Sequence, residues 1–538
     1  MDVFEIKDKD LAGRIGVLRT RSGDLRTPAF FPVVDPQKQL VTLKELEELG
    51  FRSVITNAYL LWKRYGKEVA EKGVHRFLGF EGVVMTDSGA YQVLRYGDVD
   101  IDNRTVVEFQ CLIGSDIGVI LDVPTSYDVS LGDAKRSVEV TLSRAREVQE
   151  LVTSCSATLW VLPIQGGVYT DLVRFSAAEA AKLTGYSMYG IGSPVTVMEG
   201  YMFDKLVEMI VAAKSVLPPD APVHLFGAGH PAIIPFIVAL GVDTFDSASY
   251  MLYARDERYM TESGTMRLSE LDEFPCECPV CSRYTPDELR EMSYGERVKL
   301  LALHNLHVIM RELKRTRVAL REGRLWEYLE AKSRMHPALK RAFDAVRRFY
   351  RFLEMYDVDS KGVTKAVLLY SLESVQRPRI IRRRRRIEDM GIPLWASNIV
   401  VLPGLPFDKP YSDSALARYV REVLGKDYLL VFMAPPLGAV TELLTYAYPW
   451  SQYESKYSMS VSEVEDAVGM VMEVIVKSSR RLGRVVVVDL KECEWCEYAA
   501  LRIATELRSI GIEPVILSIK CGDLYRDFLC RFSTLAKP

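Results

Sequence analysis

The chain has little of several features that would mark a specialised protein class. Among 538 residues there are only nine cysteines and six histidines, and the formal net charge is −3. So few cysteines exclude a secreted disulfide framework, and so small a net charge excludes a polycation, so any nucleic-acid surface must be local. No apolar run approaches about 18 residues, and no basic stretch precedes an apolar segment at the N-terminus. We therefore expect a cytoplasmic protein with no membrane partner.

What the sequence does contain is ordinary for a globular protein of several domains. Hydrophobic residues make up 48% and charged residues 26% of the chain, and 538 residues are too many for one core. We find no heptads, low-complexity tracts or internal repeats. We expect a barrel domain with a zinc-binding subdomain over residues 1–345, a basic helical linker over 346–394 and a C-terminal α/β region over 395–538.

The first 250 residues alternate short apolar runs with polar or glycine-rich turns and helical patterns. This rhythm predicts a parallel (β/α)₈ barrel of the TIM type. A doubly wound sheet is the alternative, but no Gly-x-Gly-x-x-Gly turn opens any of these units. The eight predicted strands are Pro28–Val34, Arg52–Asn57, Val83–Asp87, Gly118–Asp122, Thr158–Gln165, Tyr186–Gly192, Val223–Gly227 and Val242–Asp246.

Polar side chains stand at the ends of four predicted strands: Asp87, Asp122, Gln165 and Asp246. In a barrel these ends meet on the face where catalytic groups gather. Carboxylates there can attack carbon or move protons, and an amide can bind a hydrogen-bonding edge. A single Asp would more often cap a helix or lie in a solvated loop, but four converging ends favour a site for a polar, planar substrate.

Cys276, Cys278 and Cys281 are closely spaced, and His304 follows on a predicted helix. Three thiolates and an imidazole complete a tetrahedral Zn²⁺ shell and leave no position for substrate, so we predict one structural zinc. Three unrelated buried cysteines are the alternative, which the surrounding Pro, Glu and short loops disfavour. The later group Cys493, Cys496, Cys521 and Cys530 stays open between a second metal site, disulfides and reduced thiols.

The sharpest change in composition is a run of five arginines: Arg382, Arg383, Arg384, Arg385 and Arg386. Consecutive guanidinium groups neutralise RNA phosphates well, so all five are candidate RNA-binding residues, with a solvated linker as the alternative. Beyond the run we predict a strand over Val485–Asp489, a helix over Tyr498–Ile510 and a strand over Pro514–Ile519.

Several segments, in order, resemble the tRNA-guanine transglycosylases and their archaeal branch in particular. The resemblance covers about residues 10–345 closely and, more loosely, Tyr448–Gln452. It is carried by the zinc pattern and by Met85–Gln92, Gln165–Gly167, Gly192–Val195, His224–Pro231 and Phe245–Ser247.

The resemblance implies an activity and assigns roles to the polar strand ends. Such enzymes replace a guanine in tRNA with a modified base without ATP, and the archaeal branch inserts 7-cyano-7-deazaguanine at position 15 in the D-loop, towards archaeosine. By resemblance, Asp246 is the nucleophile that holds the ribose covalently, and Asp87 transfers the proton. Asp122 and Gln165 would bind the base, together with Ser88, Tyr91, Gly190, Ile191 and Gly192.

The resemblance also implies partners. The family commonly forms homodimers near its zinc region, and many archaeal members end in a tRNA-binding PUA domain. Because no PUA signature is visible here, either a separate PUA-domain protein is a candidate partner or the C-terminal region takes its place. The alternatives are a queuine-type enzyme that acts on an anticodon, an archaeosine-pathway paralogue and a non-catalytic tRNA-binding subunit. The last is disfavoured because Asp246 is intact.

Overall fold

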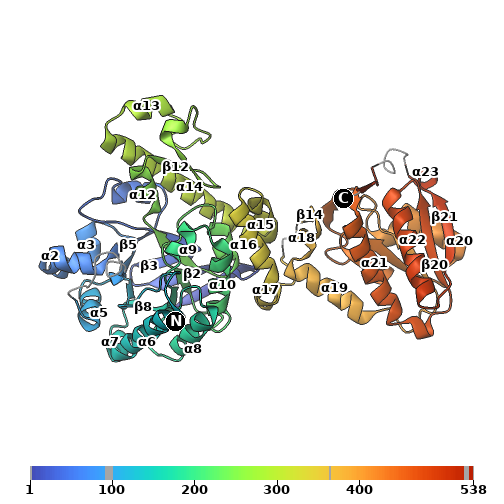
Figure 1. The fold of residues 1–538 in the computed structure, drawn as a ribbon, viewed down its shortest axis with the longest axis horizontal. Helices are drawn as coiled ribbons and strands as arrows, with labels where there is room; N and C mark the ends of the chain where they lie inside the picture. Colours follow the sequence, from blue (N-terminus) through green and yellow to red (C-terminus); the bar gives the residue numbers. More distant parts are fainter. Residues whose placement is uncertain (1–2, 91–100, 363–364, 526–531, 537–538) are drawn as a thin grey trace. The chain divides into compact units, whose positions relative to one another are not determined.

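The computed structural model describes residues 3–90, 101–362, 365–525 and 532–536, and it divides into two compact units (Figure 1). The first unit is Met1–Val358 and the second is Asp359–Pro538. The predicted linker 346–394 spans this division, and its arginine run lies in the second unit. In the described part of the chain, no helix is long and apolar enough to cross a membrane.

The first unit is built around a parallel eight-stranded barrel, which confirms the predicted fold class. The sheet order is β4-β11-β10-β9-β8-β7-β6-β5, and a bridge between Val33 and Ile55 brings its two edge strands together. Each of the eight predicted strands is present. Their bounds are β4 Ala29–Pro32, β5 Ser53–Asn57, β6 Val83–Asp87, β7 Ile117–Val119, β8 Leu159–Ile164, β9 Met188–Ile191, β10 Val223–Leu225 and β11 Thr244–Ser247.

Helices alternate with these strands, as the βα rhythm predicts. Side-chain caps fix several of their starts: the Asn57 side chain accepts a hydrogen bond from Leu60 N at the start of α2, and Ser130 accepts one from Asp133 N at the start of α6. The helices are α1 Leu43–Glu48, α2 Ala58–Lys72, α3 Val74–Leu78, α5 Asn103–Leu112, α6 Leu131–Glu147, α7 Gln149–Ser154, α8 Thr170–Ala180, α9 Val195–Glu199, α10 Phe203–Lys214, α11 Ile234–Ala239 and α12 Ser249–Arg255.

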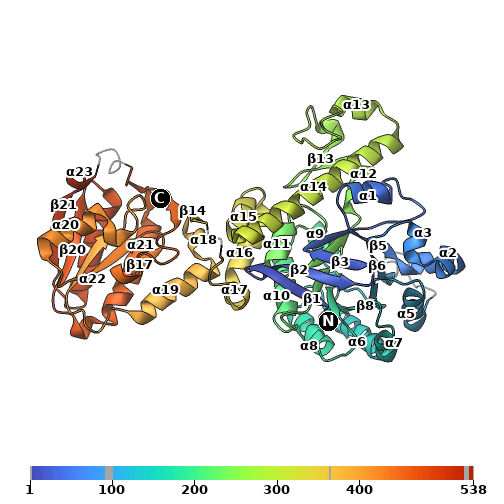
Figure 2. The same ribbon diagram turned by 180° about the vertical axis from the view of Figure 1, so that it is seen from behind.

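An antiparallel sheet that the sequence analysis did not anticipate closes the amino-terminal end of the barrel. It consists of β1 Phe4–Asp10, β2 Gly13–Thr20 and β3 Gly23–Thr27 (Figure 2). Phe4, Leu18 and Leu25 from this sheet share one buried cluster with the inward side chains of the barrel strands, such as Met85 and Val161. With that end filled, the opposite, carboxyl end is the face left to hold a ligand.

The first unit ends in a long helix and its neighbours, which carry the predicted zinc ligands. Helix α14, Tyr294–Glu322, starts at Ser293, whose side chain accepts a hydrogen bond from Glu296 N. It ends at Gly323, where φ is 68°, a left-handed conformation that favours glycine. The other elements are β12 Arg258–Met260, β13 Thr265–Arg267, η1 Leu268–Glu270, α13 Pro286–Glu291, α15 Leu325–Ser333, α16 Pro337–Arg348 and α17 Tyr350–Tyr356.

The second unit is an α/β domain around a five-stranded sheet of order β17-β16-β15-β20-β21, in which only β17 is antiparallel. The strand, helix and strand predicted near the C-terminus are confirmed as β20, α22 and β21. The strands are β14 Val367–Leu369, β15 Ile399–Pro403, β16 Leu429–Ala434, β17 Gly438–Thr441, β18 Tyr453–Ser455, β19 Met459–Ser460, β20 Val485–Lys491, β21 Val515–Lys520 and β22 Leu535–Ala536.

Helices cover this sheet, and the arginine run lies on one of them. Ile380 and Ile387 of α19 are buried in the core of the unit, so α19 is an integral part of it. The helices are α18 Leu372–Val375, α19 Pro378–Met390, η2 Tyr411–Asp413, α20 Ala415–Leu424, η3 Glu442–Leu444, α21 Val461–Val476, η4 Ser479–Arg481, α22 Glu494–Ser509 and α23 Cys521–Leu524.

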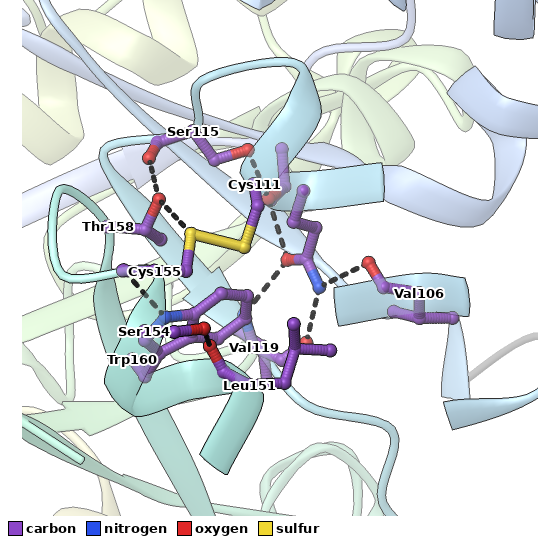
Figure 3. The surroundings of a disulfide bond; sticks show 11 residues. Val106, Cys111, Ser115, Val119, Leu151, Ser154, Cys155, Thr158 and Trp160 are labelled. Carbon is purple, nitrogen blue, oxygen red and sulfur yellow. Dashed lines mark hydrogen bonds between the residues drawn. A yellow bond between two sulfur atoms is a disulfide. The ribbon is translucent and has the colours of Figure 1, made fainter. Parts of the chain in front are cut away.

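Two disulfides join cysteines that are both described, and Cys521 is disulfide-bonded as well. Cys493 pairs with Cys496 at the start of α22, one of the alternatives left open above, whereas Cys530 lies outside the described residues. The second disulfide, Cys111–Cys155, was not anticipated and joins the end of α5 to the end of α7 (Figure 3). Beside Cys111, the Gln110 side chain bonds Thr86 Oγ1 and the backbone of Val119, so this region ties α5 to β6 and β7.

Candidate functional site at the barrel mouth

The structure brings the four predicted polar strand ends together at the carboxyl face of the barrel. Asp87 ends β6, Asp122 and Gln165 follow β7 and β8, and Asp246 lies in β11. Gln165 Nε2 donates a hydrogen bond to Asp122 Oδ2, and the charges of Asp122 and Asp246 both act on Asp87. Three carboxylates therefore share one site.

Asp246 is held by two donors. Its Oδ1 lies 3.0 Å from His224 Nε2 and accepts a hydrogen bond of 3.0 Å from Gly227 N. His224 Nδ1 lies 2.9 Å from the Thr244 hydroxyl. That hydroxyl can donate to Nδ1, which leaves the proton of a neutral imidazole on Nε2, where it points at the carboxylate. The two donors orient Asp246, and among the described residues no donor bonds its second oxygen.

Asp87 has the opposite character. Desolvation, followed by the charges of Asp122 and Asp246, raises the pKa of Asp87 to about 7, although backbone N–H groups of Gly89 and Ser88 oppose the shift. The Asn57 amide lies 3.4 Å from Asp87 Oδ2. A carboxyl group with a pKa near neutrality can both give and take a proton, which is the property that general acid–base catalysis requires.

Asp122 and Gln165 form a buried pair with a defined orientation. Burial raises the pKa of Asp122 to about 6, and the hydrogen bond from Gln165 opposes the shift. Gln165 Oε1 accepts hydrogen bonds from Ser193 Oγ at 2.9 Å and from the backbone N of Thr125 at 3.2 Å. Because these bonds fix which end of the amide is the donor, the pair can present a defined hydrogen-bonding edge.

Backbone and small side chains complete the predicted pocket. The Ser88 hydroxyl is buried and has no hydrogen-bond partner within the described part of the chain, so it can serve a ligand. A Cβ on Gly192 would lie 2.3 Å from Gln165 Nε2, so a side chain there would displace the amide. Gly190 and Ile191 end β9 beside it and are buried. Tyr91 lies outside the described residues.

Several contributors to the site were missed from the sequence. His224, Thr125, Ser193 and Asn57 all bond a predicted site residue, and Arg144 donates to the Asp122 backbone O. Asn57 ends a predicted strand, as Asp87 does, so its position was a usable signal. His224 lies inside an apolar run, and no pattern in that run indicates a buried hydrogen bond.

The cysteine and histidine cluster has the geometry of a tetrahedral metal site. One potential ligand atom from each of Cys276, Cys278, Cys281 and His304 lies within 4.8 Å of the others. His304 Nδ1 is 3.4 Å from Cys278 Sγ and 3.3 Å from Cys281 Sγ, which are 3.5 Å apart. Tetrahedral Zn²⁺ with Zn–S and Zn–N bonds of about 2.3 and 2.0 Å places its ligands roughly 3.5–3.8 Å apart, so the group fits such an ion.

Neighbouring groups orient the histidine. His304 Nε2 donates to the Met260 carbonyl at 2.9 Å, which leaves Nδ1 free to bind a metal, and the Tyr259 ring stacks on the imidazole at 3.7 Å. Asn305 bonds the backbone of Met260 and Tyr250, which ties α14 to β12 and α12. A metal here would tie the segment Cys276–Cys281 to α14.

The predicted RNA-binding arginines all lie on α19, and most of them make ion pairs within the second unit. Arg382 and Arg386 bond Asp359, and Arg383 Nη2 lies 3.4 Å from the same carboxylate. The run is therefore not the freely solvated charge that its composition suggests, because protein carboxylates already engage several of its guanidinium groups.

The five arginines differ in direction and exposure. Arg384 pairs with Asp466 at 2.7 Å instead of Asp359, so the side chains point in different directions around α19. Arg385 is half-buried on the same helix. The Arg386 side chain, at 54%, is much more exposed than the 16–25% of Arg382–Arg384. Of these five predicted residues, Arg386 is thus the most accessible to a ligand.

Comparison with known proteins places the chain in a family. A family model described as queuine tRNA-ribosyltransferase matches residues 8–338. A protein named tRNA-guanine(15) transglycosylase from Aeropyrum pernix is 48% identical over 525 residues, which cover 97% of this chain and 100% of that protein. Proteins of the same name from Sulfolobus acidocaldarius and Pyrococcus furiosus are 42% and 45% identical, over 88% and 72% of this chain and 93% and 65% of their own lengths. The chain belongs to the queuine tRNA-ribosyltransferase family.

Proposed function

We propose that the chain exchanges guanine at position 15 of tRNA for 7-cyano-7-deazaguanine, a step towards archaeosine. The observation that carries the proposal is the pairing of two unlike carboxyl groups in one mouth: Asp246, held by His224 and Gly227, and Asp87, whose pKa is raised to about 7. The names of the relatives support position 15 as the target.

The reaction follows as a double displacement. An Asp246 oxygen forms a bond to C1′ of the ribose while the bond from C1′ to the guanine nitrogen breaks, and Asp87 gives its proton to the departing base. The incoming 7-cyano-7-deazaguanine then loses a proton to Asp87, bonds C1′ and releases Asp246. Two inversions retain the original configuration.

The remaining pocket residues recognise the base. Asp122 and the Gln165 amide offer acceptor and donor atoms to the edge of a guanine-like ring, and the Ser88 hydroxyl adds one more group. The backbone of Gly190, Ile191 and Gly192 lines the same face. The guanine must leave the RNA stack to reach these groups, which costs a few kcal/mol that contacts to the rest of the tRNA offset.

The proposed function also includes a metal ion, partners and a cellular location. The cluster of Cys276, Cys278, Cys281 and His304 holds one Zn²⁺ per chain, and four protein ligands make its role structural. The arginine run Arg382–Arg386 contributes to tRNA binding. The protein acts in the cytoplasm as a homodimer, with a separate PUA-domain protein as a candidate partner. Both the dimer and the partner are inferred from family resemblance.

Label mapping tests the function directly. Incubation with unmodified tRNA and radiolabelled 7-cyano-7-deazaguanine should place the label at position 15. Transfer to a tRNA in which guanine 15 is replaced by adenine should be undetectable. Label at an anticodon guanine would instead identify a queuine-type enzyme, and no label in any tRNA would favour a paralogue or a non-catalytic subunit.

Changing Asp246 and Asp87 to their amides should affect base exchange and the protein–RNA adduct in different ways. Asp246→Asn removes the anionic nucleophile and should lower exchange by orders of magnitude, with no denaturation-resistant protein–RNA adduct on a gel. Asp87→Asn should lower exchange by roughly 10²–10⁴-fold through lost proton transfer, while the adduct can still form. An adduct that survives in Asp246→Asn would mean that the roles are reversed.

The rate of adduct formation should fall as the pH rises above about 7. Asp87 is protonated below its raised pKa of about 7, and only that form can protonate the leaving guanine. Asp122→Asn removes one of the charges that raise this pKa, so it should move the falling limb to lower pH, whatever it does to the maximal rate. Rapid-quench measurement over pH 5–9 provides the check, and a limb that does not move contradicts the electrostatic coupling.

The bound metal should support the local structure and should depend on His304. Mass spectrometry should find one zinc per chain, lost in His304→Ala but retained in His307→Ala, a change on the same helix that leaves the four cluster residues intact. Loss of the metal should loosen α13 and α14 first, seen as faster proteolysis there. Zinc retained in His304→Ala would remove the histidine from the ligand set.

A further inference from the structure

A cavity in the second unit lies between the arginine helix and the segment that follows η3. Its volume is about 450 Å³, and it does not involve the barrel. The wall includes parts of both motifs that the site at the barrel mouth leaves unused: two arginines of the run and two aromatic residues of the Tyr448–Gln452 segment. The lining residues are Arg383, Arg386, Ile387, Asp389, Met390, Leu444, Ala447, Tyr448 and Trp450.

Two hydrogen-bond donors on this wall have no acceptor. Trp450 Nε1 and Arg383 Nε are buried and, among the residues that the structure describes, find no hydrogen-bond partner. Trp450 is only 2% exposed. Since buried donors are nearly always paired in native proteins, two on one cavity wall indicate a ligand that brings acceptor atoms.

The charge around the cavity indicates that this ligand is an anion. Arg383 and Arg386 both pair with Asp359, and the same carboxylate also bonds Arg382, so one negative charge serves several guanidinium groups. The one acidic side chain on the wall, Asp389, is 80% exposed and lies 3.7 Å from Lys477 Nζ, which offsets its charge. Guanidinium groups match phosphate oxygens in both geometry and charge.

We propose that this cavity binds one nucleotide of the tRNA outside the barrel mouth. Its phosphate lies on Arg383 and Arg386, its base lies against Tyr448 and the apolar wall, and an acceptor atom of the base takes the Trp450 Nε1 proton. The proposal rests on the proposed function for the identity of the RNA. It refines the role of the arginine run, because Arg384, which pairs with Asp466, and Arg385 do not line the cavity.

A variant that removes a charge should change both the affinity for tRNA and its salt dependence, whereas a variant that removes a neutral donor should change the affinity alone. Arg386→Gln should weaken tRNA binding about 3–10-fold and lower the slope of log Kd against log salt by about one, because one phosphate contact is lost. Trp450→Phe should weaken binding by a similar factor and leave the slope unchanged. Arg502→Gln, which breaks an ion pair between α22 and Glu465, is the matched control and should change neither.

The outcomes separate this proposal from the exchange activity. Arg386 is half exposed, so Arg386→Gln should fold even where Trp450→Phe does not, and thermal melts check both. If both variants bind tRNA as Arg502→Gln does, the cavity is not an RNA site. If guanosine 5′-monophosphate binds the wild-type protein at micromolar concentration and Arg386→Gln abolishes that binding, the cavity serves a free nucleotide and the tRNA assignment is wrong. Base exchange is measured separately on the wild-type protein. If the wild-type protein does not exchange the base but Arg386→Gln and Trp450→Phe still weaken tRNA binding, only the proposed function is overturned.

Discussion

The burial of three carboxylates close together at one end of a barrel is the constraint on which the site depends. The charges of Asp122 and Asp246 both act on Asp87, and Asp122 and Asp246 are buried while Asp87 is partly buried. Desolvation and then the neighbouring charges raise the pKa of Asp87 to about 7, and desolvation raises the pKa of Asp122 to about 6. Asp246 accepts hydrogen bonds from two donors, whereas desolvation, followed by the charges of Asp122 and Asp246, raises the pKa of Asp87. In the proposed reaction, this difference suits Asp87 to acid–base catalysis and Asp246 to nucleophilic attack.

The scaffold keeps these charges from moving apart. Asp87 and Asp246 lie within hydrogen-bonded strands, and the sheet β1–β3 fills the opposite end of the barrel. Behind β6, buried Gln110 bonds both Thr86, next to Asp87, and Val119, three residues before Asp122. The disulfide from Cys111 to Cys155 fixes the helix that supplies this glutamine (Figure 3). A strained electrostatic arrangement therefore rests on a region with several independent connections.

The sequence predicted the parts of this structure that follow from local pattern. All eight barrel strands were identified because each is a short apolar run between turns, and β6 has the predicted bounds Val83–Asp87. The sheet β1–β3 was missed because Phe4–Thr27 mixes charged and apolar residues without clean alternation. Contacts between distant residues were not accessible either. Neither the link between Cys111 and Cys155 nor the pairing of the arginine run with Asp359 and Asp466 leaves a local signal.

The same carboxylates explain why RNA binding must draw on other parts of the chain. A mouth with several acidic groups repels the phosphate backbone that has to approach it, and the net charge of −3 offers no general attraction. Cationic side chains must therefore be concentrated locally, and the arginine run is the densest such group in the sequence. Most of its guanidinium groups are already engaged with Asp359 and Asp466. In its proposed role, the contribution of the run to RNA binding therefore depends on an excess of positive charge that is smaller than the count of arginines suggests. Affinity for a polyanion is set by this remaining excess, because a guanidinium that is paired within the protein releases fewer counterions when RNA binds.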